Sequence, residues 1–105
     1  MGGSGSRGWE PPRIDNPCEK LSFSSAVNSP QAAVIKTLKV NYVLDVELQT
    51  TPHIAVLLNY KGKLAGVLTG IKIASLINCL QNGYIFTADV MSISGGICRV
   101  EVRPA

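Results

Sequence analysis

The chain has 105 residues, the length of one compact domain. Hydrophobic residues make up 46% of the sequence and charged residues 16%, a balance that excludes an intrinsically disordered chain. The formal net charge of +3 permits an anionic partner without requiring one.

The first 17 residues are predicted to lie outside the folded domain. Residues 1–8 (MGGSGSRG) are typical of a flexible linker left by cloning, and Trp9–Pro17 (WEPPRIDNP) is rich enough in proline for an extended arm. No charged-then-apolar leader opens the chain. The longest apolar run, Ile54–Leu58, is far shorter than the roughly 20 residues of a membrane helix. We expect a single β-barrel domain over residues 18–105 and no membrane partner.

Three cysteines, Cys18, Cys79 and Cys98, lie far apart in the sequence, with no CxxC pair and only one histidine in the chain. A zinc site and a full disulfide framework are therefore not expected. We predict three buried, reduced thiols and a cytoplasmic protein. A single bridge between two of them remains the alternative.

The N-terminal part of the domain is predicted to hold a short strand and a helical turn. Cys18–Ser24 alternates as a strand does, with Leu21 and Phe23 on one face. Ser29-Pro30 combines a capping serine with a proline at the first helical position. One or two helical turns should therefore follow over Gln31–Leu38.

Three strands are predicted next. Asn41–Gln49 alternates, with Tyr42, Leu44, Val46 and Leu48 on one face. Ile54–Tyr60 is apolar on both faces and should form an inner strand. Lys61-Gly62-Lys63 then turns the chain into a strand over Leu64–Leu68.

After Gly70 the apolar spacing becomes helical, which predicts one firm helix over residues 70–82. Thr69 is the expected cap and Gly83 the expected left-handed residue at the end. The apolar stripe should comprise Ile73, Ala74, Ile77 and Leu80, widened by Leu76 and Cys79.

Residues 83–103 (GYIFTADVMSISGGICRVEVR) predict a β-hairpin. A two-residue turn at Gly95-Gly96 would place Val90 opposite Glu101 and mix apolar with charged side chains. A three-residue loop, Ser94-Gly95-Gly96, shifts the pairing by one residue and leaves Arg99 and Glu101 exposed. We predict this loop, with a buried face of Phe86, Ala88, Val90, Cys98, Val100 and Val102.

About six short strands around one helix predict a mainly β domain, a small OB-like or SH3-like partial barrel. No phosphate loop, dinucleotide fingerprint or GxSxG motif occurs. His53 is expected as an exposed turn residue, Asp45 and Glu47 as a solvated strand face, and Asp89 as a surface residue. We predict no enzyme, no metal and no cofactor.

Four parts follow one another in the second half of the chain. They are the apolar strand Ile54-Ala55-Val56, the segment GKLAGVL at Gly62–Leu68, a helix with Ala74 and Leu76, and the run FTADVMSISGG. This order of parts over Ile54–Val102 resembles a HIRAN domain, a small OB-like module found beside helicases and nucleases. The family binds the 3′ end of single-stranded DNA. Thr51-Pro52-His53 stands where the family has N-P-Y-D, and Val67 where it has an aromatic residue or histidine.

The sequence is compatible with two functions. In the first, a nucleic-acid-binding barrel contacts phosphates through Lys61, Lys63 and Lys72, with Thr69 at a helix N-terminus that suits an anionic group. Its partner would be single-stranded DNA or DNA ends. In the second, the domain binds a protein or a second copy through an exposed strand edge and the Trp9 arm. The resemblance favours the first.

Overall fold

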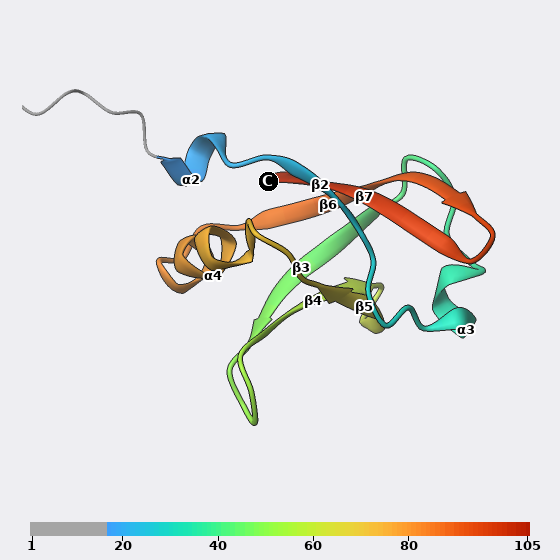
Figure 1. Ribbon diagram of the computed structural model, residues 1–105, viewed down its shortest axis with the longest axis horizontal. Helices are drawn as coiled ribbons and strands as arrows, with labels where there is room; N and C mark the ends of the chain where they lie inside the picture. The colour runs from blue at the N-terminus through green and yellow to red at the C-terminus, as the bar shows by residue number, and fades with distance from the viewer. Residues whose placement is uncertain (1–16) are drawn as a thin grey trace, which may run out of the picture.

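The computed structural model describes residues 17–105, which form a mainly β domain (Figure 1). Six antiparallel strands make one curled sheet, a half-barrel, in the order β2-β7-β6-β3-β4-β5. The strands are β2 (Phe23–Ala26), β3 (Val43–Gln49), β4 (Ala55–Tyr60), β5 (Lys63–Leu68), β6 (Phe86–Ser94) and β7 (Ile97–Pro104). The helices are α2 (Pro17–Lys20), α3 (Ala32–Ile35) and α4 (Ile73–Gln81). The predicted fold class is confirmed; the predicted linker and nearly all of the arm lie outside the described residues.

The strand faces follow the period of two in the sequence. In β3, Leu44 and Val46 are buried while Val43, Asp45 and Glu47 are exposed, as predicted for this strand. The buried residues of the described chain are all hydrophobic, and they form one core inside the curl of the sheet. The core therefore needs no buried charge and no hydrogen bond between side chains to hold it together.

The two edges of the sheet meet at one point. After β2 the chain crosses from β7 to β5 on its way to α3 (Figure 1). The Val27 amide donates to the Cys98 carbonyl at 2.8 Å, and Asn28 and Val67 then exchange both backbone hydrogen bonds at 2.9 and 2.8 Å. The Gln31 amide donates to the Ala65 carbonyl at 2.9 Å. These bonds pair the edge of β5 and hold the sheet in its curl.

This closure depends on Gly66. A Cβ built at Gly66 would lie 2.8 Å from the Asn28 carbonyl oxygen and would overlap the Cγ1 of Val27. The missing side chain lets the crossing segment lie directly against β5. Ala65, the preceding residue, is the extra residue of a bulge opposite Leu58 and Asn59, and it is fully buried.

The β6–β7 hairpin has the predicted buried face, but its turn and its strand pairing differ from the prediction. The turn is the two-residue Gly95-Gly96, both with positive φ, and Ser94 pairs with Ile97. The predicted three-residue loop is therefore wrong. A bulge at Met91 supplies the one-residue shift instead, and it brings Val90 opposite Val100. All six residues of the predicted apolar face are buried, whereas Arg99 is exposed and Glu101 is half-buried.

The N-terminal elements differ from the prediction. A helical turn occupies Pro17–Lys20, and β2 begins only at Phe23. The proline suits the first position of a helix, and Cys18 points inward as the buried residue of α2. α3 is shorter than expected. Gln31 stands at its N-cap position, whereas Ser29 has a positive φ of 47° and caps nothing.

Helix α4 was correctly predicted, except at its start. Gly83 ends it with a φ of +89°, as expected. The N-cap position is Lys72, without a side-chain cap, so Thr69 does not cap the helix. Leu76 and Cys79 form the buried centre of the apolar stripe, and Ala74 lies exposed outside it. No helix within residues 17–105 is long and apolar enough to cross a membrane.

A disulfide joins Cys18 of α2 to Cys79 of α4, with the Cα atoms 5.5 Å apart. Cys98 is a free, buried cysteine. The prediction of three reduced thiols is therefore wrong, and the open alternative of one bridge is correct. The argument for a reducing compartment rested on those thiols and loses its basis. Sequence spacing could not reveal the pair because 61 residues separate its members.

We predict that Gly66→Ala lowers the free energy of unfolding by at least about 2 kcal/mol, as expected when an added methyl overpacks a tight contact. The Asn28 carbonyl is backbone and cannot swing away as a flexible side chain would. Urea unfolding measures the loss. Gly62→Ala is the control, because a Cβ there meets no atom within 4 Å and only the positive φ opposes it. An equal or smaller loss for Gly66→Ala would contradict the tight closure.

We also predict that Leu76→Ala costs about 2–5 kcal/mol in unfolding free energy, the range for deleting a large core side chain. Leu76 is 0% exposed, whereas the adjacent Ile77 is only half-buried. Ile77→Ala should therefore cost clearly less in the same urea titration. A larger loss at Ile77 would show that α4 is rotated from the orientation described.

Candidate functional site

The four predicted site residues fall at the two ends of β5. Lys61 lies in the turn before this strand and Lys63 is its first residue. Thr69 and Lys72 follow its last residue, Leu68. A six-residue strand at ~3.3 Å per residue spans roughly 17 Å between its end residues. The structure therefore separates the predicted cluster into two pairs.

Thr69 belongs to the closure of the barrel. Its hydroxyl oxygen accepts a hydrogen bond from the side-chain amide of Asn28 at 2.6 Å. The amide of Ile73, the first residue of α4, donates to the Gly70 carbonyl at 3.2 Å. Thr69 thus contributes to the closure beside the Asn28–Val67 bridge, and its role at the start of the helix stays a prediction.

Lys61 and Lys63 border a pocket of about 290 Å³ between α3 and the β4–β5 turn. Its volume lies just below the range of roughly 300–1,000 Å³ that is typical of small-ligand sites. The sequence pattern gave no reason to expect α3 here, because α3 reaches this end only through the crossing after β2. The lining residues are Ala33, Val34, Thr37, Tyr60, Lys61 and Lys63.

Two tyrosines organise the lysine side of this pocket. The rings of Tyr42 and Tyr60 stack with centroids 5.5 Å apart and planes 20° apart. The Lys61 ammonium lies 5.3 Å from the centroid of the Tyr60 ring, within the range of a cation–π contact. The contacts favour one orientation of Tyr60 at the pocket rim.

A second pocket, of about 300 Å³, lies on the other side of α3 against β6 and its turn. Its lining is apolar except for Lys36. The residues that line the two pockets include three lysines, Lys36, Lys61 and Lys63, and no acidic residue. This end of the barrel therefore favours an anionic ligand over a cationic one.

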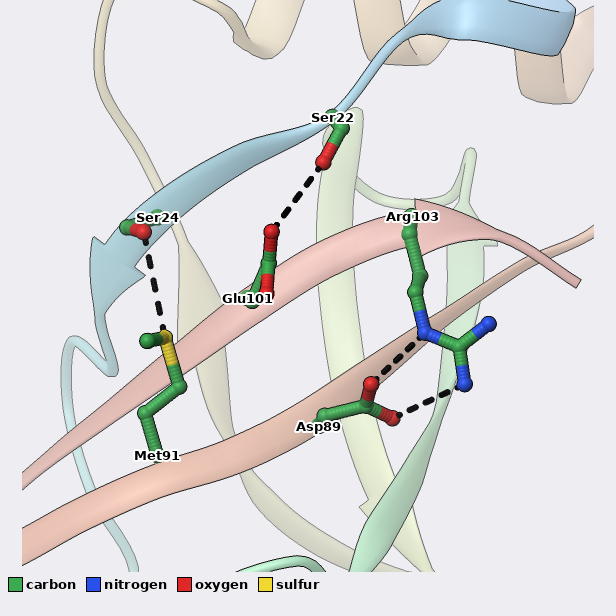
Figure 2. A network of polar contacts seen from close by, with 6 residues as sticks. All are labelled: Ser22, Ser24, Asp89, Met91, Glu101 and Arg103. Carbon is green, nitrogen blue, oxygen red and sulfur yellow. Dashed lines mark hydrogen bonds and ion pairs between the residues drawn. The ribbon is translucent and has the colours of Figure 1, made fainter.

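The outer face of the β2-β7-β6 sheet carries a different set of polar contacts (Figure 2). Arg103 of β7 donates to both carboxylate oxygens of Asp89 on β6, at 2.6 and 3.4 Å. This hydrogen bonding, together with the charge of Asp89, raises the pKa of Arg103. Asp89 is thus a surface residue with a partner, which agrees with its interpretation from the sequence. The pair neutralises both charges at this point of the sheet.

Two serines of the N-terminal segment join the same face. The Ser22 hydroxyl donates to Glu101 at 3.4 Å, and the Ser24 hydroxyl contacts the sulfur of Met91 at 3.8 Å (Figure 2). Met91 is the bulge residue, so its side chain leaves the alternation of β6 and reaches toward β2. These contacts attach the edge strand to the hairpin and form no cavity of their own.

The remaining polar candidates do not assemble into a chemical site. His53 is exposed in the β3–β4 loop, where its carbonyl accepts a hydrogen bond from the Gln49 side chain at 3.2 Å. Asp45 and Glu47 lie exposed on the outer face of β3. Among residues 17–105, no three His, Cys, Asp or Glu side chains gather as a metal site. The pocket whose lining includes Lys61, Lys63 and Tyr60 is therefore taken as the candidate site.

Comparisons of the chain with family models, with curated proteins and with solved structures found no match.

Proposed function

We propose that the protein is a non-catalytic module that binds single-stranded nucleic acid at the pocket bordered by Lys61 and Lys63. The observation that carries the proposal is the combination of two lysines and the Tyr60 ring at the rim of an apolar pocket with no acidic residue in its lining. A nucleic-acid strand offers the matching parts, an anionic backbone and flat apolar rings. The likeness to HIRAN domains supports the same ligand class.

The polar groups of the pocket suit phosphate better than base edges. Lysine ammonium groups donate hydrogen bonds and carry charge, but they hold no information on base identity. The Thr37 hydroxyl donates to the Val34 carbonyl at 2.6 Å, so its hydrogen is already used within α3. Binding should therefore depend on salt and differ little between base sequences.

The alternative function, protein binding through an exposed strand edge, finds less support at β5. The edge of β5 is already hydrogen-bonded to the segment after β2. The Val67 amide donates to this segment, and the Val67 and Ala65 carbonyls accept from it. An added strand would have to displace that segment. Within the described residues, β5 therefore lacks the free edge that this alternative needs.

We predict that Lys61→Glu and Lys63→Glu each lower the slope of log K against log salt by about 0.7, the value of one single-strand phosphate contact. The measurement is a fluorescence titration of short oligo-dT and oligo-dA at several salt concentrations. Both oligonucleotides should lose affinity alike, because the lysines contact phosphate.

Lys72→Glu is the matched control for this experiment. It changes the net charge by the same amount, but Lys72 lies beyond the far end of β5. For the Lys72→Glu variant, the slope of log K against log salt should stay close to that of the unmodified protein. Equal losses for all three variants would indicate general charge attraction and not a site. The absence of oligonucleotide binding at ~50 mM salt would favour the protein-binding alternative.

A further inference from the structure

Helix α3 separates the two pockets at this end of the barrel. One side of the helix, with Ala33 and Val34, lines the pocket of about 290 Å³ beside the β4–β5 turn. The other side, with Ala32 and Ile35, lines the pocket of about 300 Å³ beside β6 and its turn. Both volumes are at or just below the lower limit for small-ligand sites, roughly 300 Å³. Each pocket therefore suits one flat group and not a whole oligonucleotide.

The surface of α3 between the pockets is low. Ala32 and Ala33 are the first two residues of the helix, and both are exposed. A helix with ordinary side chains is about 10–12 Å wide, and alanine side chains end at Cβ. The crossing from one pocket to the other over this turn of α3 is therefore short and free of long side chains.

The pocket beside β6 combines apolar walls with a positive charge. Ile35 and Ile93 supply apolar surface, and Lys36 is exposed at the edge. Apolar side chains, like aromatic ones, can hold a base by its faces. Within residues 17–105, no ion pair involves Lys36, Lys61 or Lys63. Each pocket thus offers an apolar surface beside lysine charge that no carboxylate neutralises.

We infer that the two pockets form one site, in which a single strand of nucleic acid crosses α3 and places one base in each pocket. This inference rests on the function proposed above for the pocket at Lys61 and Lys63. Stacked nucleotides advance by about 3.4 Å along a strand, so roughly three steps cover the width of the helix. The smallest ligand that fills both pockets is therefore about four nucleotides long, and Lys36 contacts a phosphate beside its second base.

Titration of the unmodified full chain with fluorescent oligo-dT of increasing length tests the two-pocket site. Affinity should rise at least about tenfold between the dinucleotide and the tetranucleotide and then level off, because only the longer ligand stacks a base in the second pocket. Removal of one base at a time from a hexanucleotide should show two sensitive positions. The positions between them should tolerate the loss, because those bases cross α3 outside both pockets.

Two adjacent alanines provide matched variants. Ala32→Leu fills the pocket beside β6, and Ala33→Leu fills the pocket beside the β4–β5 turn. Both residues are exposed and leucine is a good helix former, so both variants should fold. Ala32→Leu should weaken binding of the tetranucleotide about tenfold and leave the dinucleotide unchanged. Ala33→Leu should weaken binding of both, because the dinucleotide binds at the pocket with two lysines.

Lys36→Glu and Lys39→Glu separate a phosphate contact from general charge attraction. Both lysines are exposed and lie three positions apart, but only Lys36 lines a pocket. Lys36→Glu should lower the slope of log K against log salt by about 0.7 for the tetranucleotide and leave the slope for the dinucleotide unchanged. Lys39→Glu should change neither slope.

The possible failures are distinguishable. Maximal affinity already at the dinucleotide, or a single base-sensitive position, would overturn the two-pocket site and leave the function proposed at Lys61 and Lys63 standing. Equal slope changes for Lys36→Glu and Lys39→Glu would likewise overturn it. The absence of binding by any oligonucleotide at ~50 mM salt would overturn both proposals.

Discussion

The backbone contact between Asn28 and Val67 is the constraint on which the rest of this structure depends. It joins the segment after one edge strand, β2, to the other edge strand, β5, and so holds six strands in a curl around one core. The contact is close because Gly66 presents no side chain to the crossing segment. A hydrogen bond between the side chains of Asn28 and Thr69 stabilises the same contact.

The closure also creates the candidate binding site. The chain that crosses to β5 continues directly into α3, and α3 then lies between the β4–β5 and β6–β7 hairpins with a pocket on each side. Helix α4 lies at the opposite end of the sheet, where the disulfide attaches α2 (Figure 1). The proposed ligand site and the Cys18–Cys79 disulfide are therefore at separate ends of the domain.

In the β4–β5 and β6–β7 hairpins the same two features determine the strand register. Each has a two-residue turn with positive φ at both positions, Lys61-Gly62 in one and Gly95-Gly96 in the other. Each then carries a bulge, at Ala65 or at Met91, that shifts the pairing by one residue. Such turns suit the right-handed twist of paired strands, and bulges add local bending. Together they give a short sheet enough curvature to nearly close on itself.

Much of the fold could be predicted because it follows from periodicity. The faces of β3, the buried face of the β6–β7 hairpin and the extent of α4 all reflect which positions are apolar. The cause of the hairpin register could not be predicted in this way. Either a three-residue loop or a bulge places Val90 and Val100 on the same face, so the apolar pattern does not distinguish them. Periodicity is a local signal, and it says nothing of contacts between distant segments.

The parts that depend on such distant contacts were missed. Cys18 alternates with its neighbours as in a strand, but its bond to Cys79 accompanies a helical turn. Lys61 and Lys72 are close in sequence, yet an intervening strand holds them apart. The place of α3 beside Lys61 follows only from the crossing after β2, which leaves no pattern in the sequence apart from the glycine at position 66.

Native-state hydrogen exchange at the Val67 amide tests the central claim most directly. This amide donates to the Asn28 carbonyl at 2.8 Å, so it should be protected as strongly as the Val90 amide, which donates to the Tyr42 carbonyl in the middle of the sheet. Exchange of Val67 at the rate of an open sheet edge, with Val90 still protected, would show that the two edges do not meet and would contradict the account.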